Sequence, residues 1–287
     1  MDDFRGAVER GLAPEHAESL VALSTEAGWN QVAADWRFML RLGSGIGMAD
    51  EAGRWIASAL ALPMAPRLWW LSMVLTTKAW RGRGIGTHLL RRCIETVRAQ
   101  GATPGLDATE LGRPVYLPLG FADVYALRRW HIERAPEAAA PPAGIRIRRA
   151  AAADMAAVAA YDAPRSAMRR GDILAHLQGR APYLAFVAER GDALAGFVLG
   201  REGRIAHSLG PIVADGEAIA LALAAQAGLA ARPPFVADVP IRHDGMRRWL
   251  EASGAVSPRG FTRMVLGAAP GLAANERVFA ISGPELA

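Results

Sequence analysis

The residues most suited to chemistry form a loop of alternating arginine and glycine. Gly82, Gly84 and Gly86 follow an apolar run, lie beside Arg81 and Arg83, and precede an amphipathic pattern. Such a loop directs several backbone N–H groups to one point at the positive end of a helix, where the glycines let a ligand approach closely. The two guanidinium groups add positive charge. The segment therefore predicts a phosphate or pyrophosphate site.

Two common nucleotide-binding signatures do not fit this loop. The lysine followed by serine or threonine that defines a P-loop is missing, which argues against ATP or GTP hydrolysis. A dinucleotide fingerprint needs its third glycine three positions after the second, and here the interval is two. A glycine-rich turn in front of a core helix, without a ligand, remains the alternative interpretation.

Other reactive side chains show no catalytic spacing. The six histidines are scattered without the intervals of metal ligands, so no metal is expected. There is no Gly-x-Ser-x-Gly sequence for a nucleophilic serine. Cys93 falls on the apolar side of a predicted helix and is interpreted as a small core residue.

Hydrophobic periodicity predicts alternating strands and helices, which is typical of an α/β fold with a mixed sheet. The first half is expected to contain strands over residues 45–49, 55–62, 69–76, 106–108 and 121–130, and helices over 14–27, 31–41, 86–100 and 114–119. The second half is expected to contain strands over 145–149, 183–190, 193–200, 205–213, 235–239 and 261–266, and helices over 152–161, 166–178, 217–230 and 245–252.

One segment, residues 135–144, marks a predicted domain boundary. It lacks apolar periodicity and contains a Pro-Pro pair, as extended connectors do. We therefore expect a first domain over residues 1–134 and a second over 145–287. The order of elements repeats across the connector, which indicates a duplicated unit.

Composition excludes several classes of protein. The net charge is +5, but the 33 basic residues include one lysine, and the arginines are dispersed rather than clustered, so no nucleic-acid partner is expected. The N-terminus does not read as a signal peptide, and no apolar run is long enough for a membrane span. A single cysteine favours a reducing, cytoplasmic location. The sequence leaves homodimer formation open.

Two motifs in the first half resemble those of the GCN5-related N-acetyltransferases. Residues 81–86 fit the (Gln/Arg)-x-x-Gly-x-(Gly/Ala) signature in its strand–loop–helix setting, and residues 116–121 are similar to the family's Tyr-x-x-x-Gly-Phe segment. The resemblance covers about residues 11–130. It implies two tandem acetyltransferase-like domains, each with a mixed, mostly antiparallel sheet flanked by helices, the second one degenerate.

The resemblance implies acetyl-CoA as the donor. The backbone of Val74, Leu75 and Thr76 would pair with the pantetheine arm, and the N–H of Val74 or Leu75 would polarise the thioester carbonyl. The pyrophosphate would lie against the loop and the first turn of the helix, formed by Arg81, Gly82, Arg83, Gly84, Ile85, Gly86 and Thr87.

The resemblance also suggests how protons are transferred while an amine attacks the thioester directly. Tyr116 matches the family's usual acid for the leaving thiolate, and the alternative is that its ring packs while its hydroxyl satisfies a backbone group. Asp107 is a candidate base, and the alternative is that it caps the following turn. Glu110 is a second candidate base. The family's asparagine ahead of the tyrosine is absent here.

The acceptor is expected to be the primary amine of an unidentified small molecule. Trp29, Asp35 and Trp36 lie in the helices that roof the acceptor site in this family, although tryptophans at helical spacing more often belong to the core. Two alternatives keep the fold: a CoA-binding sensor without turnover, and a transferase for another acyl group.

The second half is expected to have lost its donor site. Where the loop would be, Asp215 and Glu217 flank a glycine and would repel a pyrophosphate. We expect this domain to pack on the first and to close its acceptor pocket. Asp238 and Arg263 are expected to pair, most simply as a structural salt bridge.

Overall fold

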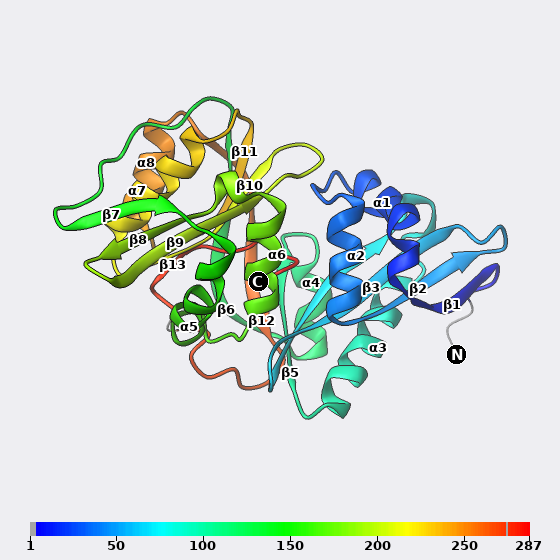
Figure 1. Cartoon of the computed structure of the whole chain (residues 1–287). Helices are drawn as coiled ribbons and strands as arrows, with labels where there is room; N and C mark the ends of the chain where they lie inside the picture. The colour runs from blue at the N-terminus through cyan, green and yellow to red at the C-terminus, as the bar shows by residue number, and fades with distance from the viewer. Residues whose placement is uncertain (1–3, 274) are drawn as a thin grey trace. The chain divides into compact units, whose positions relative to one another are not determined.

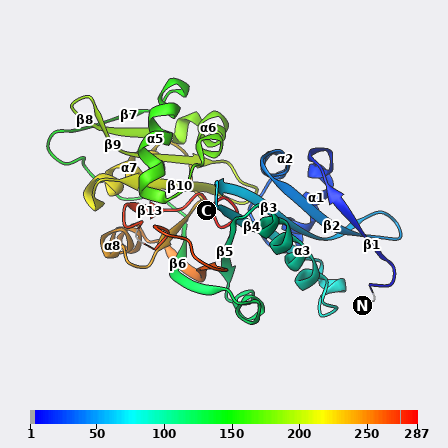
Figure 2. The same cartoon turned by 90° about the horizontal axis from the view of Figure 1, so that it is seen from below.

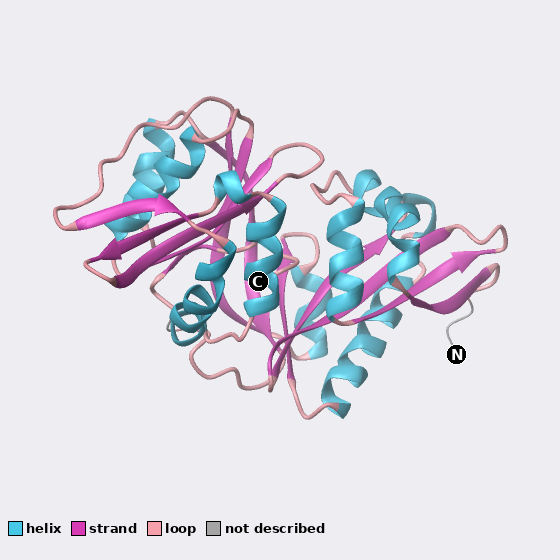
Figure 3. Ribbon diagram, in the orientation of Figure 1, coloured by secondary structure: helices cyan, strands magenta, loops and turns pink. Residues whose placement is uncertain are grey.

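The computed structural model describes residues 4–273 and 275–287 and has an α/β architecture. Backbone contacts divide the chain into two compact units. Unit 1 consists of Met1–Leu106 with Gly203–Ile205, and unit 2 of Asp107–Glu202 with Ala206–Ala287. In both units helices flank the strands (Figure 3). In the part of the chain that is described, no helix combines the length and the apolar character needed to span a bilayer.

The strands of unit 1 follow one another in chain order (Figure 1). Neighbours are antiparallel up to the last pair, which is parallel. They are β1 (Ala7–Leu12), β2 (Ser44–Asp50), β3 (Trp55–Ala65), β4 (Leu68–Thr76) and β5 (Thr103–Thr109), the last of which ends in unit 2. The central strand β3 is almost entirely buried.

Three helices cover the sheet of unit 1. They are α1 (Ala17–Glu26), α2 (Ala33–Leu42) and α3 (Ile85–Ala99). Helices α1 and α2 pack on one face and α3 on the other (Figures 1 and 2). The apolar stripe of α3 recurs at helical spacing and is buried throughout, as the sequence pattern predicts. Its members are Ile85, Leu89, Leu90, Cys93, Ile94 and Val97.

Unit 2 has strands in the order β12–β6–β11–β10–β9–β8–β7, with β13 paired to β10. Only β10 and β11 are parallel among its described ladders. The strands are β6 (Ala122–Ile132), β7 (Ile145–Arg149), β8 (Phe186–Arg190), β9 (Ala193–Arg201), β10 (His207–Ala214), β11 (Phe235–Pro240), β12 (Val256–Val265) and β13 (Val278–Ala280). The helices are α4 (Arg113–Tyr116), α5 (Met155–Ser166), α6 (Gly171–Arg180), α7 (Glu217–Leu229) and α8 (Asp244–Ala252).

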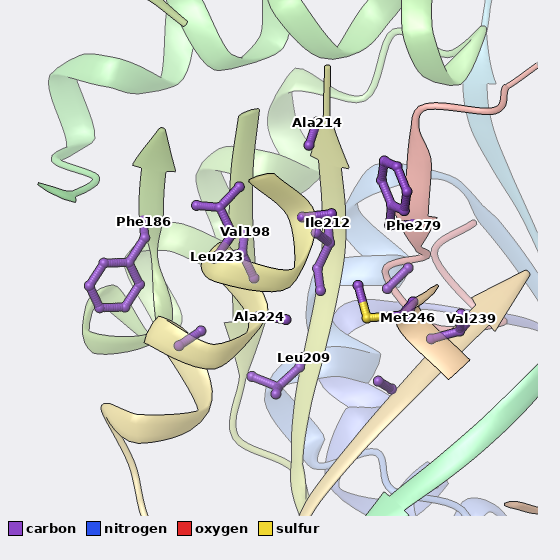
Figure 4. Packing of buried hydrophobic residues seen from close by; sticks show 14 of the residues in the cluster. Phe186, Val198, Leu209, Ile212, Ala214, Leu223, Ala224, Val239, Met246 and Phe279 are labelled. Atoms are coloured by element: carbon purple, nitrogen blue, oxygen red, sulfur yellow. The ribbon is translucent and has the colours of Figure 1, made fainter. Parts of the chain in front are cut away.

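The core of unit 2 forms around α7, an alanine-rich helix that packs on β8, β9 and β10. A helix that is apolar on all sides is stable in water only when it is buried. Leu223 and Ala224 of α7 lie against Val198 and Ile212 of the sheet (Figure 4). The small alanine side chains let the helix approach the strands closely.

The expected fold class is confirmed, with several local differences. Strands β1 and β13 were not expected, since β1 is a partly exposed edge strand without an alternating pattern and β13 has three residues. Helices α5 and α6 begin three and five residues later than expected, and a 3-10 turn at Pro182–Leu184 delays β8.

The strand β6 takes an unexpected place in the sheet. It pairs with β11 on one side and with β12 on the other, so that its ladders lie in unit 2. The contact boundary lies earlier in the chain, within β5, between Leu106 and Asp107. Residues 135–142 have no regular secondary structure and connect β6 to β7, and the domain boundary expected there stays a prediction.

Candidate functional site

The strand β4 loses its parallel partner halfway along its length. The ladder with β5 joins Leu68–Trp70 to residues 103–105 and ends there, whereas β4 continues to Thr76. The last six residues of β4 thus extend beyond the ladder, at the segment where the sequence predicts pairing with a donor. Backbone groups at such an edge are available to a ligand.

A β-bulge interrupts β4 at the same point. In its register with β3, Ser58 faces Leu75 but Leu60 faces Ser72, so one extra residue is accommodated in β4. Met73 has a φ of 52°, a left-handed backbone conformation that residues other than glycine adopt only with strain. The buried Ser58 hydroxyl donates to the Met73 carbonyl over 2.7 Å. This bond satisfies the Met73 carbonyl where the bulge disturbs the ladder.

The predicted anion loop follows directly and ends at the N-terminus of α3. Gly82 and Gly84 have φ values of 76° and 82°, and a side chain at either position would meet nothing within 4 Å. The first α-helical bond runs from the His88 amide to the Gly84 carbonyl over 2.9 Å, so the amides of residues 85–87 precede it. The first turn of α3 contains no acidic residue. The loop therefore presents amides and a positive helix end to open space.

Both arginines of the loop are held by the chain and remain exposed. The Arg81 Nε donates to the Thr76 carbonyl over 3.1 Å. The guanidinium of Arg83 lies 4.5 Å from the centroid of the Trp80 ring and reaches the Ala79 carbonyl. Such contacts restrict two flexible side chains before any ligand arrives, which lowers the entropic cost of binding.

Tyr116 ends α4 and is half-buried. Its ring packs on Phe121, with ring centroids 5.9 Å apart. Its hydroxyl makes no hydrogen bond with any residue that the structure describes, so the packing alternative does not account for the hydroxyl group. Burial raises the pKa of Tyr116 to about 12, and the group therefore stays a protonated phenol at neutral pH.

Asp107 lies in a buried ion pair. Arg263 donates from Nε and Nη2 to the two carboxylate oxygens of Asp107 over 2.9 and 2.7 Å, and both side chains are almost completely buried. Burial raises the pKa of Asp107, and the guanidinium opposes that shift. The turn that follows is capped instead by Thr109, whose hydroxyl accepts from the Gly112 amide over 3.0 Å. The role of Asp107 as a base stays a prediction.

The expected pair of Asp238 with Arg263 is wrong. Asp238 accepts two hydrogen bonds from Arg129 over 2.8 and 2.6 Å, because Asp238 on β11 stands directly opposite Arg129 on β6. Because β6 lies between β11 and β12, Asp238 pairs with Arg129 of β6, and Arg263 of β12 pairs with Asp107 instead. Glu110, the second candidate base, is exposed.

The three residues expected at an acceptor pocket belong to the helical part of unit 1. Trp36 is fully buried and its Nε1 donates to the Ser24 hydroxyl over 3.1 Å. Asp35 is also buried and accepts from the Val32 amide at the start of α2 over 2.9 Å. Both side chains thus serve the packing of unit 1. Trp29 is half-buried, and its part in acceptor binding stays a prediction.

Unit 2 has acidic residues at the start of α7, where a donor loop would be needed. Asp215 accepts from the Tyr161 hydroxyl over 2.9 Å and from Arg165 over 2.8 Å, and it also pairs with Arg277. The Glu217 carboxylate accepts from the Met246 amide over 3.0 Å. This end of the helix therefore carries negative charge, which opposes the binding of a pyrophosphate.

A reactive cysteine or a cluster of metal-ligating side chains would indicate other chemistry in the described part of the chain. Cys93 is buried in the stripe of α3, and burial raises the pKa of its thiol to about 12. A thiol that remains protonated is a poor nucleophile. Among the described residues, no group of three or more histidine, cysteine or acidic side chains is arranged to hold a metal ion.

Comparisons with protein families match each half of the chain separately. Residues 14–121 match the model described as the acetyltransferase (GNAT) family, and residues 158–280 match a second model, described as an acetyltransferase (GNAT) domain. A curated relative, the uncharacterized N-acetyltransferase YitH of Bacillus subtilis (strain 168), is 27% identical over 120 residues. That match spans 42% of this chain and 42% of the relative.

Solved structures share the fold of both halves together. A putative acetyltransferase from Pyrococcus horikoshii aligns with a TM-score of 0.81 at 20% identity, over 99% of this chain and 97% of that one. A tandem GNAT protein from the clavulanic acid biosynthesis pathway aligns with a TM-score of 0.62 at 14% identity, over 91% and 99% of the two chains. At these identities the likeness concerns the fold.

The buried pair predicts a large loss of stability when one partner is removed. In Asp107→Asn the Arg263 charge stays buried without its counter-ion, so the free energy of unfolding in urea should fall by about 3–5 kcal/mol. Asp123→Asn is the matched control because it breaks an Arg–Asp pair that is about 40% exposed, and it should cost under about 1 kcal/mol. Equal losses in the two variants would contradict the assignment.

Proposed function

Because this chain belongs to the GCN5-related N-acetyltransferase superfamily in its tandem form, we propose that it transfers an acetyl group from acetyl-CoA to the primary amine of a small-molecule acceptor. The observation that supports this most strongly is the loop of unit 1. Gly82 and Gly84 leave open space at the start of α3, beside a strand that is bulged and lacks its parallel partner. A phosphorylated donor with an extended arm fits such a strand and helix terminus.

The residues of unit 1 would bind the donor through backbone groups. The amides of residues 82–87, with Arg81 and Arg83 beside them, suit a pyrophosphate. The edge of β4 from Val74 to Thr76 would pair with the pantetheine arm. The bulge at Met73 changes the direction of the following amides, so that the N–H of Val74 or Leu75 is our candidate donor to the thioester carbonyl. Acetyl-CoA supplies the activated acyl group.

The transfer itself needs one bond made, one bond broken and two protons moved. The neutral nitrogen of the acceptor attacks the carbonyl carbon, and the C–S bond breaks. The thiolate takes the proton of Tyr116, whose hydroxyl is protonated and has no partner among the described residues. The new ammonium group loses a proton to a base. Asp107, whose two oxygens each accept one hydrogen bond from Arg263, is our candidate for that base.

The donor loop makes a direct prediction for binding. Gly84→Glu places a carboxylate where the pyrophosphate is expected, and titration calorimetry should show acetyl-CoA affinity at least about 100-fold weaker through charge repulsion. Gly101→Glu is the matched control, because Gly101 has a φ of 66° and open space at the other end of α3. It should carry a similar backbone strain and bind acetyl-CoA normally. Unchanged affinity in Gly84→Glu would refute the loop assignment.

A second prediction concerns the acid. Tyr116→Phe should lower kcat by about 100-fold with little change in acetyl-CoA affinity, as loss of a proton donor does. Since burial raises the pKa of Tyr116 to about 12, the wild-type rate should not decline up to pH 10. Tyr183→Phe removes another hydroxyl whose pKa is raised to about 12, and it should leave kcat unchanged. Full activity in Tyr116→Phe would remove this residue from the mechanism.

A further inference from the structure

One sheet face of unit 2 carries a connected set of charged side chains. The pairs are Arg129 with Asp238, Arg201 with Glu285 and Arg263 with Asp107, and all six side chains are at most 10% exposed. Each arginine in these pairs has one carboxylate, so the three pairs are electrically balanced. Buried charges are tolerated when they are compensated in this way.

Arg259 belongs to the same face and breaks this balance. It is half-buried on β12, and no described residue lies within hydrogen-bond or ion-pair distance of its guanidinium. The acids whose fields reach it are Asp238 and Glu285, which are already paired with other arginines. Burial and the charge of Arg129 lower the pKa of Arg259. The network thus contains one guanidinium without a carboxylate.

The position of Arg259 makes this imbalance costly. In the ladder between β6 and β12, Arg259 stands directly opposite Arg129, and like charges at facing positions destabilise a sheet. Both guanidinium groups lie near the Phe261 ring, at 5.1 and 5.5 Å from its centroid. An anion bound at this pair would remove the repulsion.

A neutral hydrogen-bonding group adjoins the two arginines. His131 follows Arg129 on the same face of β6, and burial together with Arg129 and Arg259 lowers its pKa. It is therefore uncharged at neutral pH. No residue in the described part of the chain forms a hydrogen bond with its ring. The site thus combines one unpaired guanidinium, one paired guanidinium and a free imidazole.

We propose that Arg259, supported by Arg129 and His131, binds the carboxylate or phosphate group of an anionic small molecule. The planar guanidinium matches the two oxygens of either group. This anion site does not depend on the proposed acetyl transfer.

The anion site is tested first without any acyl donor. Inorganic phosphate and succinate are titrated into the wild-type protein and into Arg259→Gln, which should weaken binding of the preferred anion at least tenfold. Arg128→Gln is the matched control, because Arg128 is exposed, faces Gly260 in the same ladder and lies on the opposite side of the sheet. It should bind as the wild type does. Equal weakening in both variants, or no binding that depends on Arg259, would overturn the proposal.

Two further measurements exclude simpler explanations. Phosphate also suits the glycine loop of unit 1, so the titrations are repeated in Gly84→Glu, where the binding that depends on Arg259 should persist. Without a ligand, Arg259→Gln should melt at the same temperature as the wild type or higher, because it removes an uncompensated charge. A lower melting temperature would indicate a structural role for Arg259 and would overturn the proposal.

Discussion

The unpaired amides at the start of α3 are the constraint on which the proposed chemistry of unit 1 depends. A helix leaves its first N–H groups without intrahelical partners, and side-chain caps, water or ligands satisfy them. Here the N-cap is Gly84, which has no side chain to offer, and no acidic residue follows in the first turn. The open end therefore has donors and positive potential but no acceptor of its own.

In unit 2 the start of α7, which corresponds to the start of α3, is acidic. Asp215 and Glu217 stand at the start of α7 and are engaged with the chain's own arginines and amides. Their negative charge would repel a phosphorylated donor at this helix terminus. The two units match two acetyltransferase models, yet the first turn of α3 in unit 1 carries no acidic residue, whereas that of α7 in unit 2 carries Glu217. This contrast supports one donor site per chain.

Local sequence patterns predict the glycine loop and α3, but they do not predict which distant side chains and strands pair. The periodic stripe of α3 and the glycines before it identify a helix and its start from a few neighbouring residues. No local pattern indicates that Arg263 pairs with Asp107, 156 residues away, or that β6 lies between β11 and β12. The bulge at Met73 depends on the hydroxyl of Ser58 from another strand. Asp35 and Trp36 are buried, and their part in acceptor binding stays a prediction because polar and aromatic groups serve caps and cores as well as pockets.

The most direct measurement of the central claim is hydrogen–deuterium exchange with and without acetyl-CoA. If the donor binds to the strand and helix terminus of unit 1, the amides of residues 74–76 and 82–87 should gain protection, and those of residues 214–220 should not change. This pattern would locate the donor without any mutation. Protection at residues 214–220, or no change in unit 1, would contradict the account.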